Sequence, residues 1–262
     1  AKGMLDAARL LDRRYDLVVT NVPYLARGKQ NDTLKDYCAR FFSDAKNDLA
    51  TVFLERCWQL TNEAGSFAVV SPQNWWFLGG YSAFRQWLLS DSSLQLLAAL
   101  GEESWEHFGD RGPLATLLLA KKVKPSSGWQ FAAIDAVKVK ALDAKKVTLR
   151  ADTLLPLSQE AQVRNPDSRI TLSDGASGPL LSEYAIAPNG MHGGDSMRFR
   201  MAFWEIGSES DCWVRFQSPT DISAHYAGRV HIFYWPDGGK LHIENANARV
   251  QGQSAWGQLG VA

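Results

Sequence analysis

The chain has 262 residues, which is enough for one large domain or two ordinary ones. Hydrophobic residues make up 45% of it and charged residues 21%, so it should fold as a globular protein and not remain disordered. The formal net charge is zero, which gives no argument for a nucleic-acid partner but leaves room for a local basic face.

Cysteine usage and hydrophobic runs narrow the class further. Cys38, Cys57 and Cys212 lie far apart and form no Cys-x-x-Cys pair, which argues against disulfide and zinc frameworks. No apolar run has the length of a membrane span, and the first ten residues lack the layout of a signal peptide. We therefore expect a cytoplasmic protein. Because the sequence opens within a helical pattern without Met and closes within an apolar segment, we also expect an internal piece of a longer polypeptide.

The first 124 residues alternate between patterns typical of helices and of strands. Apolar spacing predicts helices over residues 4–13, 47–65 and 81–91, and continuous apolar runs predict strands over 15–21, 66–72, 94–100 and 113–122. The runs at 15–21 and 66–72 are typical of buried parallel strands. This alternation predicts an α/β domain with a mostly parallel sheet.

Two of these segments carry further expectations. Residues 25–46 are polar and too long for an ordinary connection, so we expect a functional loop there. In the helix over 47–65, Asn47 or Asp48 can form the N-cap and Gly65 the end. Its expected buried face consists of Leu49, Val52, Phe53, Cys57 and Leu60.

The character of the sequence changes after Lys124. Short strands are expected at residues 129–134 and 145–150, followed by a segment rich in Gly, Pro, Ser and Asp. Further strands are expected at 198–206 and 229–235, the second ending at the hairpin turn "PDGG". We divide the chain into a first domain over 1–125, a connecting region over 126–169 and a mixed or mostly β region over 170–262.

The first strand ends in "NVPY", residues 21–24, and in an α/β sheet ligands bind at the carboxyl ends of strands. An amine on an aromatic base is a poor nucleophile, because its lone pair is delocalised into the ring. The Asn21 side-chain oxygen and the Val22 carbonyl can accept hydrogen bonds from its two N–H groups. These bonds would localise the lone pair for attack on an electrophilic methyl group. Pro23 restricts Val22 to extended backbone and fixes the direction of that carbonyl. The Tyr24 ring can stack on a base that has left the duplex.

The sequence "TNVPY" resembles the Asn-Pro-Pro-Tyr signature of N6-adenine DNA methyltransferases, with Val22 in place of the first proline. The segments "NDLATVFLERCWQLTNEAGSFAVVSPQNWWF" and "EHFGDRGPLATLLLAKK" resemble the stretches that follow this signature in the family. "APNGMHGGDSMRFRMAFWEI" is similar to the entry of the target-recognition domain in large restriction–modification and BREX-type phage-defence methyltransferases. The resemblance implies a partial Rossmann-like catalytic domain followed by the start of a DNA-reading domain.

The resemblance also implies roles for particular residues. S-adenosylmethionine is the expected cofactor, with Asn21 and Phe53 as cofactor-binding candidates, and Phe108 is expected to pack against the flipped adenine opposite Tyr24. Core packing is the alternative for Phe53 and Phe108. The family's Gly-rich cofactor loop does not precede Tyr15, so we expect this chain alone to bind the cofactor poorly and to be inactive.

Three cations are candidates for contacts to double-stranded DNA. Arg27 and Lys29 follow the motif on the long segment, and Arg198 lies at the entry to the expected DNA-reading region. A solvated surface is the alternative for all three. We expect no metal site, since the five histidines show no ligand spacing.

The motif itself leaves three functions open. The first is methylation of adenine N6 in DNA within restriction–modification or phage defence. The second is methylation of a protein glutamine amide, because the same acceptor pair suits any planar amide nitrogen. The third is a non-catalytic DNA-binding or assembly module, with Val22 as the sign of a decayed site. "NVPY" alone is also compatible with an ordinary turn at the end of a strand.

Overall fold

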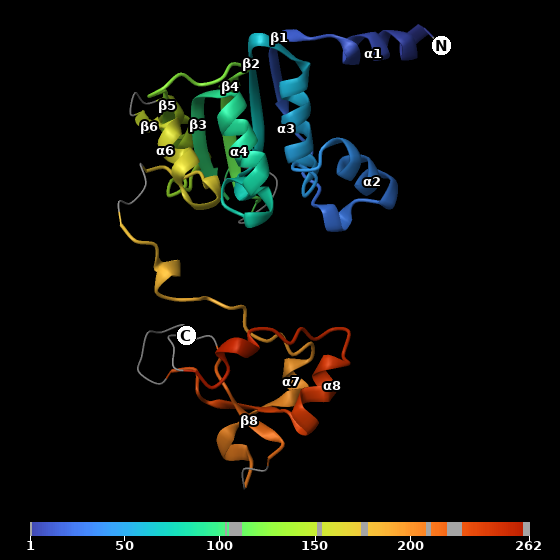
Figure 1. Ribbon diagram of the computed structural model, residues 1–262, viewed down its shortest axis with the longest axis vertical. Helices are drawn as coiled ribbons and strands as arrows, with labels where there is room; N and C mark the ends of the chain where they lie inside the picture. Colours follow the sequence, from blue (N-terminus) through green and yellow to red (C-terminus); the bar gives the residue numbers. More distant parts are fainter. Residues whose placement is uncertain are drawn as a thin grey trace. The chain divides into compact units, whose positions relative to one another are not determined.

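The computed structural model describes residues 2–102, 104, 112–150, 154–173, 178–207, 211–218 and 227–258. The chain forms two compact units, Ala1–Ser177 and Gly178–Ala262 (Figure 1). The helices of the first unit are α1 (Lys2–Asp12), α2 (Asp32–Phe41), α3 (Leu49–Leu60), α4 (Ser82–Asp91), α5 (Leu142–Arg150) and α6 (Gln159–Arg164). Its strands are β1 (Tyr15–Asn21), β2 (Thr61–Pro72), β3 (Ser93–Gly101), β4 (Ala115–Lys121), β5 (Gln130–Asp135) and β6 (Leu155–Ser158).

The six strands form one sheet in the order β1-β2-β4-β3-β5-β6. β1 pairs in parallel with β2, and β3 pairs in parallel with β5. β4 lies antiparallel between β2 and β3, and β6 is antiparallel to β5. Four of the six strands therefore run in one direction, which confirms the predicted α/β fold with a mostly parallel sheet.

The helices α3, α4 and α6 lie on one face of this sheet (Figure 1). Their apolar side chains pack with those of the central strands into a core that includes Leu54, Phe84, Leu88, Leu94 and Leu97. At the N-terminus of α3, Asp48 accepts a hydrogen bond from the main-chain N–H of Ala50, as an N-cap does. The predicted capping position is therefore confirmed, but the helix ends at Leu60, because Thr61 already pairs with Tyr15 in the sheet.

The expectation that β1 is buried is wrong. β1 lies at the end of the strand order, and Leu17 and Val19 are 60% and 68% exposed. Among the described residues, only β2 pairs with it, so one long edge has no neighbouring strand. The continuous apolar run identified the strand correctly but could not distinguish a central strand from an edge strand.

The first unit extends well past residue 125, where the sequence analysis placed its end. β5 and β6 continue the sheet beyond β3, and α6 packs on the same face as α4. Residues 145–150, expected as a strand, belong to α5. The region over 126–169 is therefore not a connection, because its strands hydrogen-bond with those of the first domain.

The second unit contains a three-stranded antiparallel sheet in the order β7-β9-β8, formed by β7 (Arg200–Ala202), β8 (Trp213–Phe216) and β9 (His231–Tyr234). Two short helices, α7 (Ser196–Phe199) and α8 (Lys240–Ile243), accompany it. The mixed or mostly β character is confirmed. The expected hairpin at "PDGG" is wrong: within the described part of the chain β9 pairs with the two earlier strands alone, and the turn leads into α8.

Candidate functional site

The carboxyl edge of the first sheet brings together segments that are far apart in the sequence. Asn21 at the end of β1 lies beside Val70 of β2, and Pro72 at the end of β2 lies beside Ala115 at the start of β4. Gly101 at the end of β3 also pairs with Ala115. Residues 21–24 are therefore placed where ligands bind in sheets of this class.

The motif residues alternate between exposed and buried positions. Asn21 and Pro23 are exposed, whereas Val22 is 4% exposed and belongs to the hydrophobic core. The main-chain N–H of Val22 donates to the Val70 carbonyl at 3.4 Å. The core contacts of the Val22 side chain and its bond to β2 fix the Val22 backbone, while Asn21 stays accessible at the carboxyl edge of the sheet.

Tyr24 is half-buried and packs against the core. Burial, and secondly the Asp48 carboxylate, raise the pKa of the Tyr24 phenol to about 12. The side chain is therefore a neutral phenol at physiological pH, a form suited to stacking and hydrogen bonding and not to acid–base chemistry.

The segment after Tyr24 is a closed excursion and not an open loop. It contains a 3-10 turn at Arg27–Lys29 and the helix α2, whose Cys38 is buried. Its two ends are joined by main-chain hydrogen bonds, Arg27 N–H to Asn47 O at 2.9 Å and Leu49 N–H to Leu25 O at 3.0 Å. The Asp48 carboxylate adds a bond from the Leu25 N–H at 3.2 Å.

The two cations predicted on this excursion differ in their surroundings. Arg27 is half-buried, and its guanidinium donates to the Lys35 carbonyl of α2 at 3.3 Å. Lys29 is exposed. Arg27 therefore contributes to the excursion itself, whereas Lys29 has the exposure that a phosphate contact requires.

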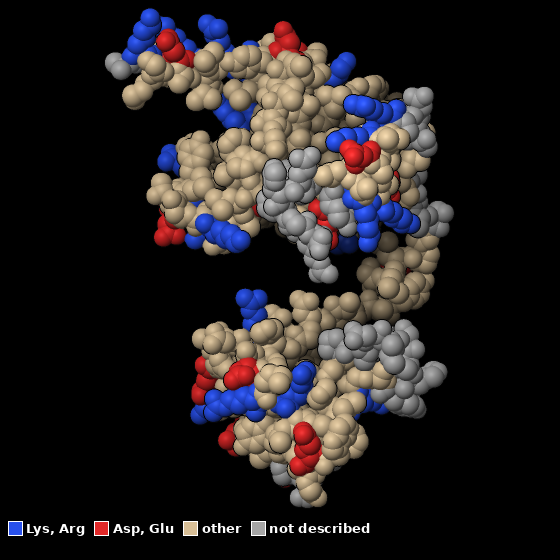
Figure 2. All heavy atoms as spheres, turned by 180° about the vertical axis from the view of Figure 1, so that it is seen from behind, with Lys and Arg blue, Asp and Glu red and all other residues tan. Residues whose placement is uncertain are grey.

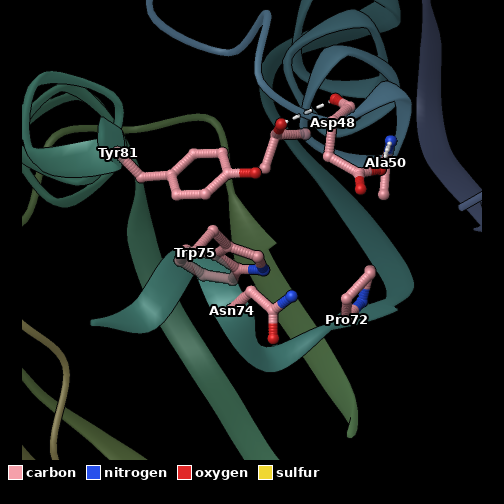
Figure 3. A pocket seen from close by; sticks show the side chains of 7 residues that line it. Asp48, Ala50, Pro72, Asn74, Trp75 and Tyr81 are labelled. Atoms are coloured by element: carbon pink, nitrogen blue, oxygen red, sulfur yellow. Dashed lines mark hydrogen bonds between the residues drawn. The ribbon is translucent and has the colours of Figure 1, made fainter. Parts of the chain in front are cut away.

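A small hollow lies at the N-terminus of α3 (Figure 3), where Asp48 also bonds to Leu25 after the motif. One wall comes from the N-terminus of α3 and the other from the segment that follows β2. Its lining residues are Asp48, Ala50, Thr51, Pro72, Asn74, Trp75 and Tyr81. The Asn74 carboxamide and the Tyr81 ring face the interior of the hollow (Figure 3).

This hollow was not predicted from the sequence. Asp48 was noticed only as a helix cap, and Asn74, Trp75 and Tyr81 were assigned no role in it. One signal was available: polar and aromatic residues directly after Pro72 follow a strand that ends at the same edge as β1. None of Asn21 to Tyr24 lines the hollow, although Asp48 connects it to the motif through Leu25.

The remaining predicted site residues are scattered. Phe53 on α3 is 40% exposed, so the core packing considered for it is wrong and its ring is open to a ligand. Phe108 lies outside the described residues. Arg198 is exposed on α7 in the second unit, with its guanidinium 5.3 Å from the centre of the Phe199 ring.

Cations and anions are interspersed on the visible face of both units (Figure 2). Exposed cations of the second unit include Arg198, Arg215 and Arg229. Within the described residues there is no group of three or more His, Cys, Asp or Glu side chains arranged to hold a metal ion. A helix both long and apolar enough to cross a membrane is likewise missing from the described part of the chain.

Comparisons with known proteins add three findings. Residues 5–105 match the family described as Eco57I restriction-modification methylase. The adenine-specific methyltransferase BrxX of Escherichia coli O9:H4 is 37% identical over 101 residues, which cover 38% of this chain and 8% of that protein. The adenine-specific methyltransferase PglX of Lacticaseibacillus casei is 31% identical over 123 residues, which cover 47% of this chain and 10% of that protein.

Among solved structures, the type IIL restriction-modification enzyme MmeI in complex with DNA matches with a TM-score of 0.50 and 14% identity. The match covers 86% of this chain and 30% of that one, and it supports the fold. The chain spans about a tenth or less of the two curated relatives. Residues 5–105 of the chain match the Eco57I restriction-modification methylases. This match and the two adenine-specific relatives confirm the resemblance to adenine-specific DNA methyltransferases that the sequence predicted.

Proposed function

We propose that this chain supplies the catalytic edge of a DNA methyltransferase that methylates adenine N6, in restriction–modification or phage defence. The observation that carries this proposal is the placement of residues 21–24: Asn21 is exposed at the carboxyl edge, and Val22 is anchored beside it by the core. This motif falls within residues 5–105, the segment that matches the methylase family. A substrate of this kind also implies a cytoplasmic protein.

The proposed chemistry depends on two oxygen atoms of neighbouring residues. The Asn21 side-chain oxygen and the Val22 main-chain carbonyl each accept a hydrogen bond from one N–H group of the adenine amine. These two hydrogen bonds localise the nitrogen lone pair, which the purine ring otherwise delocalises, and direct it at the methyl donor. Pro23 restricts Val22 to extended backbone and so limits the directions that its carbonyl can take.

The flipped base needs aromatic contacts to replace the stacking that it loses in the duplex. Tyr24 offers the part of its ring that is not packed against the core, and Phe108 is proposed as the second contact. The segment that carries Phe108 leaves the sheet at Gly101 and returns at Leu114, whose carbonyl accepts a hydrogen bond from the Gln73 N–H at 2.8 Å. Both described ends of this segment therefore lie at the same edge as Asn21.

S-adenosylmethionine fits the residues present and would supply the electrophilic methyl group. An exposed aromatic ring on α3, that of Phe53, suits the adenine of the cofactor, and Asn21 stands at the rim where the methyl group must arrive. Asn21 is the last residue of β1, and Phe53 lies on α3, which contacts β1 and β2. We keep the expectation that residues 1–262 alone bind this cofactor weakly.

Contacts to double-stranded DNA are proposed for Lys29 and Arg27 near the motif and for the second unit as a target-recognition region. Exposed arginines of the second unit, Arg198 among them, suit contacts to individual phosphates. Methylation of a protein glutamine is not favoured, because both curated relatives are adenine-specific methyltransferases.

Replacement of Asn21 by Ala in the full-length gene product tests this proposal. We expect methylation of adenine in DNA to fall about 100-fold or more, because one of the two polar groups that act in the transition state is removed. DNA binding, measured by fluorescence anisotropy, should stay unchanged. A variant that methylates DNA at the wild-type rate would falsify the assignment.

The matched control is Val22→Pro, which restores the proline of the family signature. The acceptor carbonyl is retained, and the hydrogen bond lost is the long one from the Val22 N–H to Val70 at 3.4 Å. We expect its methylation rate to stay within about tenfold of the wild type, since the loss of one such bond costs roughly 1 kcal/mol. An inactive Asn21→Ala together with an active Val22→Pro would assign the Asn21 acceptor and show that the valine side chain and N–H are not required.

A further inference from the structure

Arg85 on α4 is a completely buried cation, with 0% of its surface exposed. Burial lowers the pKa of its guanidinium, and the charge of Asp167 partly offsets this effect. Buried charges are normally paired with an opposite charge in direct contact. The hydrogen bonds of Arg85 show a different arrangement.

Among the described residues, its hydrogen-bond acceptors are all main-chain carbonyl oxygens, and they come from two separate segments. One terminal nitrogen donates to Trp75 O at 2.7 Å and to Leu78 O at 2.8 Å. Nε donates to Asp167 O and Ser168 O, each at 3.2 Å, and the other terminal nitrogen donates to Asp167 O at 2.8 Å. The Asp167 carboxylate lies instead 3.2 Å from the guanidinium of Arg169.

The first of these segments, Gln73–Leu78, forms one wall of the hollow at the N-terminus of α3. It leaves the sheet at Pro72, and its residues Asn74 and Trp75 line the hollow (Figure 3). The second segment, residues 166–170, is the turn that follows α6. One more bond joins it to the first, from the Ile170 N–H to Trp76 O at 2.9 Å. Ser82 at the start of α4 also donates from its Oγ to Asp167 O at 3.3 Å.

The planar guanidinium suits this role, because it presents five donors in a fixed fork. A lysine ammonium is a compact charge with three donors and cannot reproduce this fork, with which Arg85 reaches four carbonyls on two segments. The identity of residue 85 therefore depends on geometry as well as on charge.

We propose that Arg85 is a positioning residue: it fixes the Gln73–Leu78 wall against the 166–170 turn and so holds Asn74 and Trp75 at the edge where Asn21 lies. Its effect on catalysis rests on the proposed function. The positioning itself does not, and it can be tested without any assay of methyl transfer.

The first test is hydrogen exchange, followed by mass spectrometry, on the 262-residue chain with the substitution Arg85→Lys. We expect peptides that cover residues 73–80 and 165–171 to exchange about tenfold faster or more, with β2, β3 and β4 unchanged. The control is Arg169→Lys, an exposed arginine on the same turn whose ion pair with Asp167 should contribute little. Faster exchange across the whole sheet, or no change in either segment, overturns the proposal.

A milder variant covers the case in which Arg85→Lys does not fold. Ser82→Ala removes only the bond to the Asp167 carbonyl, which Arg85 also holds. Because Ser82 lies on α4, this variant should speed exchange in residues 165–171, and to a smaller extent. If exchange rises elsewhere and not in residues 165–171, the bonds from α4 do not hold this turn and the proposal is wrong.

The second test measures methyl transfer by the full-length gene product. Arg85→Lys should lower kcat about tenfold or more, because small displacements of groups around a reacting centre have large effects. KM for S-adenosylmethionine should stay within about twofold, since Phe53 and Asn21 lie on other elements. An unchanged kcat, or an equal loss in Arg169→Lys, contradicts a positioning role. A wild-type protein that methylates no DNA refutes the proposed function, while local loosening in the exchange experiment still supports the role of Arg85.

Discussion

Val22 shows how a single residue can depart from a family signature without losing its proposed role. The atom that accepts the hydrogen bond from the amine is the main-chain carbonyl oxygen, which valine and proline both have. The valine side chain lies in the core at 4% exposure, and its N–H bonds to Val70, which proline cannot do. A proline at this position would be held rigid by its ring. Valine is held instead by core packing and by one backbone hydrogen bond.

Glu55 on α3 makes the stability of the first unit depend on pH. Burial, and secondly the Asp44 carboxylate, raise the pKa of Glu55 from 4.5 to about 7. A carboxyl group whose pKa is raised by folding binds its proton more tightly in the folded state, so its contribution is most favourable below the unfolded value. Stability is then lost as the pH rises from about 4.5 to about 7. We expect Glu55→Gln to raise the free energy of unfolding at pH 8 by roughly 2–3 kcal/mol.

Urea unfolding at pH 5 and pH 8 measures this effect. The gain from Glu55→Gln should be much smaller at pH 5, where the folded carboxyl group is already protonated. Glu160→Gln is the control, because Glu160 is exposed on α6 and pairs only loosely with Arg164 at 3.6 Å. Its effect should stay within about 1 kcal/mol at both pH values. Equal gains for Glu55→Gln at both pH values would show that Glu55 is not the source.

At the scale of elements, local signals predicted the regular segments well and their surroundings poorly. The strand at 15–21 was predicted to the residue, because its apolar run is bounded by polar residues. Its exposure was missed, since a strand's neighbours are set by residues elsewhere in the sequence. Residues 145–150 were expected as a strand but form the end of α5, where the Lys145 ammonium is buried against the carbonyls of Leu100 and Ala136. That tertiary contact overrides the local pattern.

The excursion between β1 and α3 depends on Asp48, which serves as the helix cap and joins the two ends. Its carboxylate accepts from the Ala50 N–H at 2.9 Å and the Leu25 N–H at 3.2 Å. Asp48→Ala removes both acceptors, and we expect a loss of roughly 1–3 kcal/mol in the free energy of unfolding. Thermal and urea unfolding of the chain measure this loss.

Asp48→Asn is the matched variant, because asparagine keeps an oxygen in the same position and is an equally good N-cap. It should cost less than about 1 kcal/mol. If both variants lose the same stability, the negative charge and not the hydrogen bonds would be responsible. The excursion carries Arg27 and Lys29. Separating its two ends should therefore also weaken the DNA contacts proposed for these residues.

At the scale of the whole molecule, the hardest feature to predict was the limit of the first unit. The change in composition after Lys124 is real, but β5 and β6 return to the sheet through hydrogen bonds with β3 and with each other. Pairing across such separations leaves no local mark in the sequence. For the candidate site, the motif at 21–24 was identifiable, whereas the hollow is formed by residues 48–51 and 72–81, which meet only in the fold.

The division into two units predicts that each can be destabilised separately, and the glycine-rich segment of the second unit provides the test. Gly194 has φ +70°, and a Cβ there would lie 2.9 Å from the Asn247 carbonyl carbon, so Gly194→Ala should cost about 2 kcal/mol or more. Gly190→Ala is the control, because nothing lies within 4 Å of a Cβ at that position. In hydrogen exchange, Gly194→Ala should expose the peptides of β8 and β9 and leave those of β2 and β4 protected. Loss of protection in both units together would show that they unfold as one, contrary to the division at Ser177.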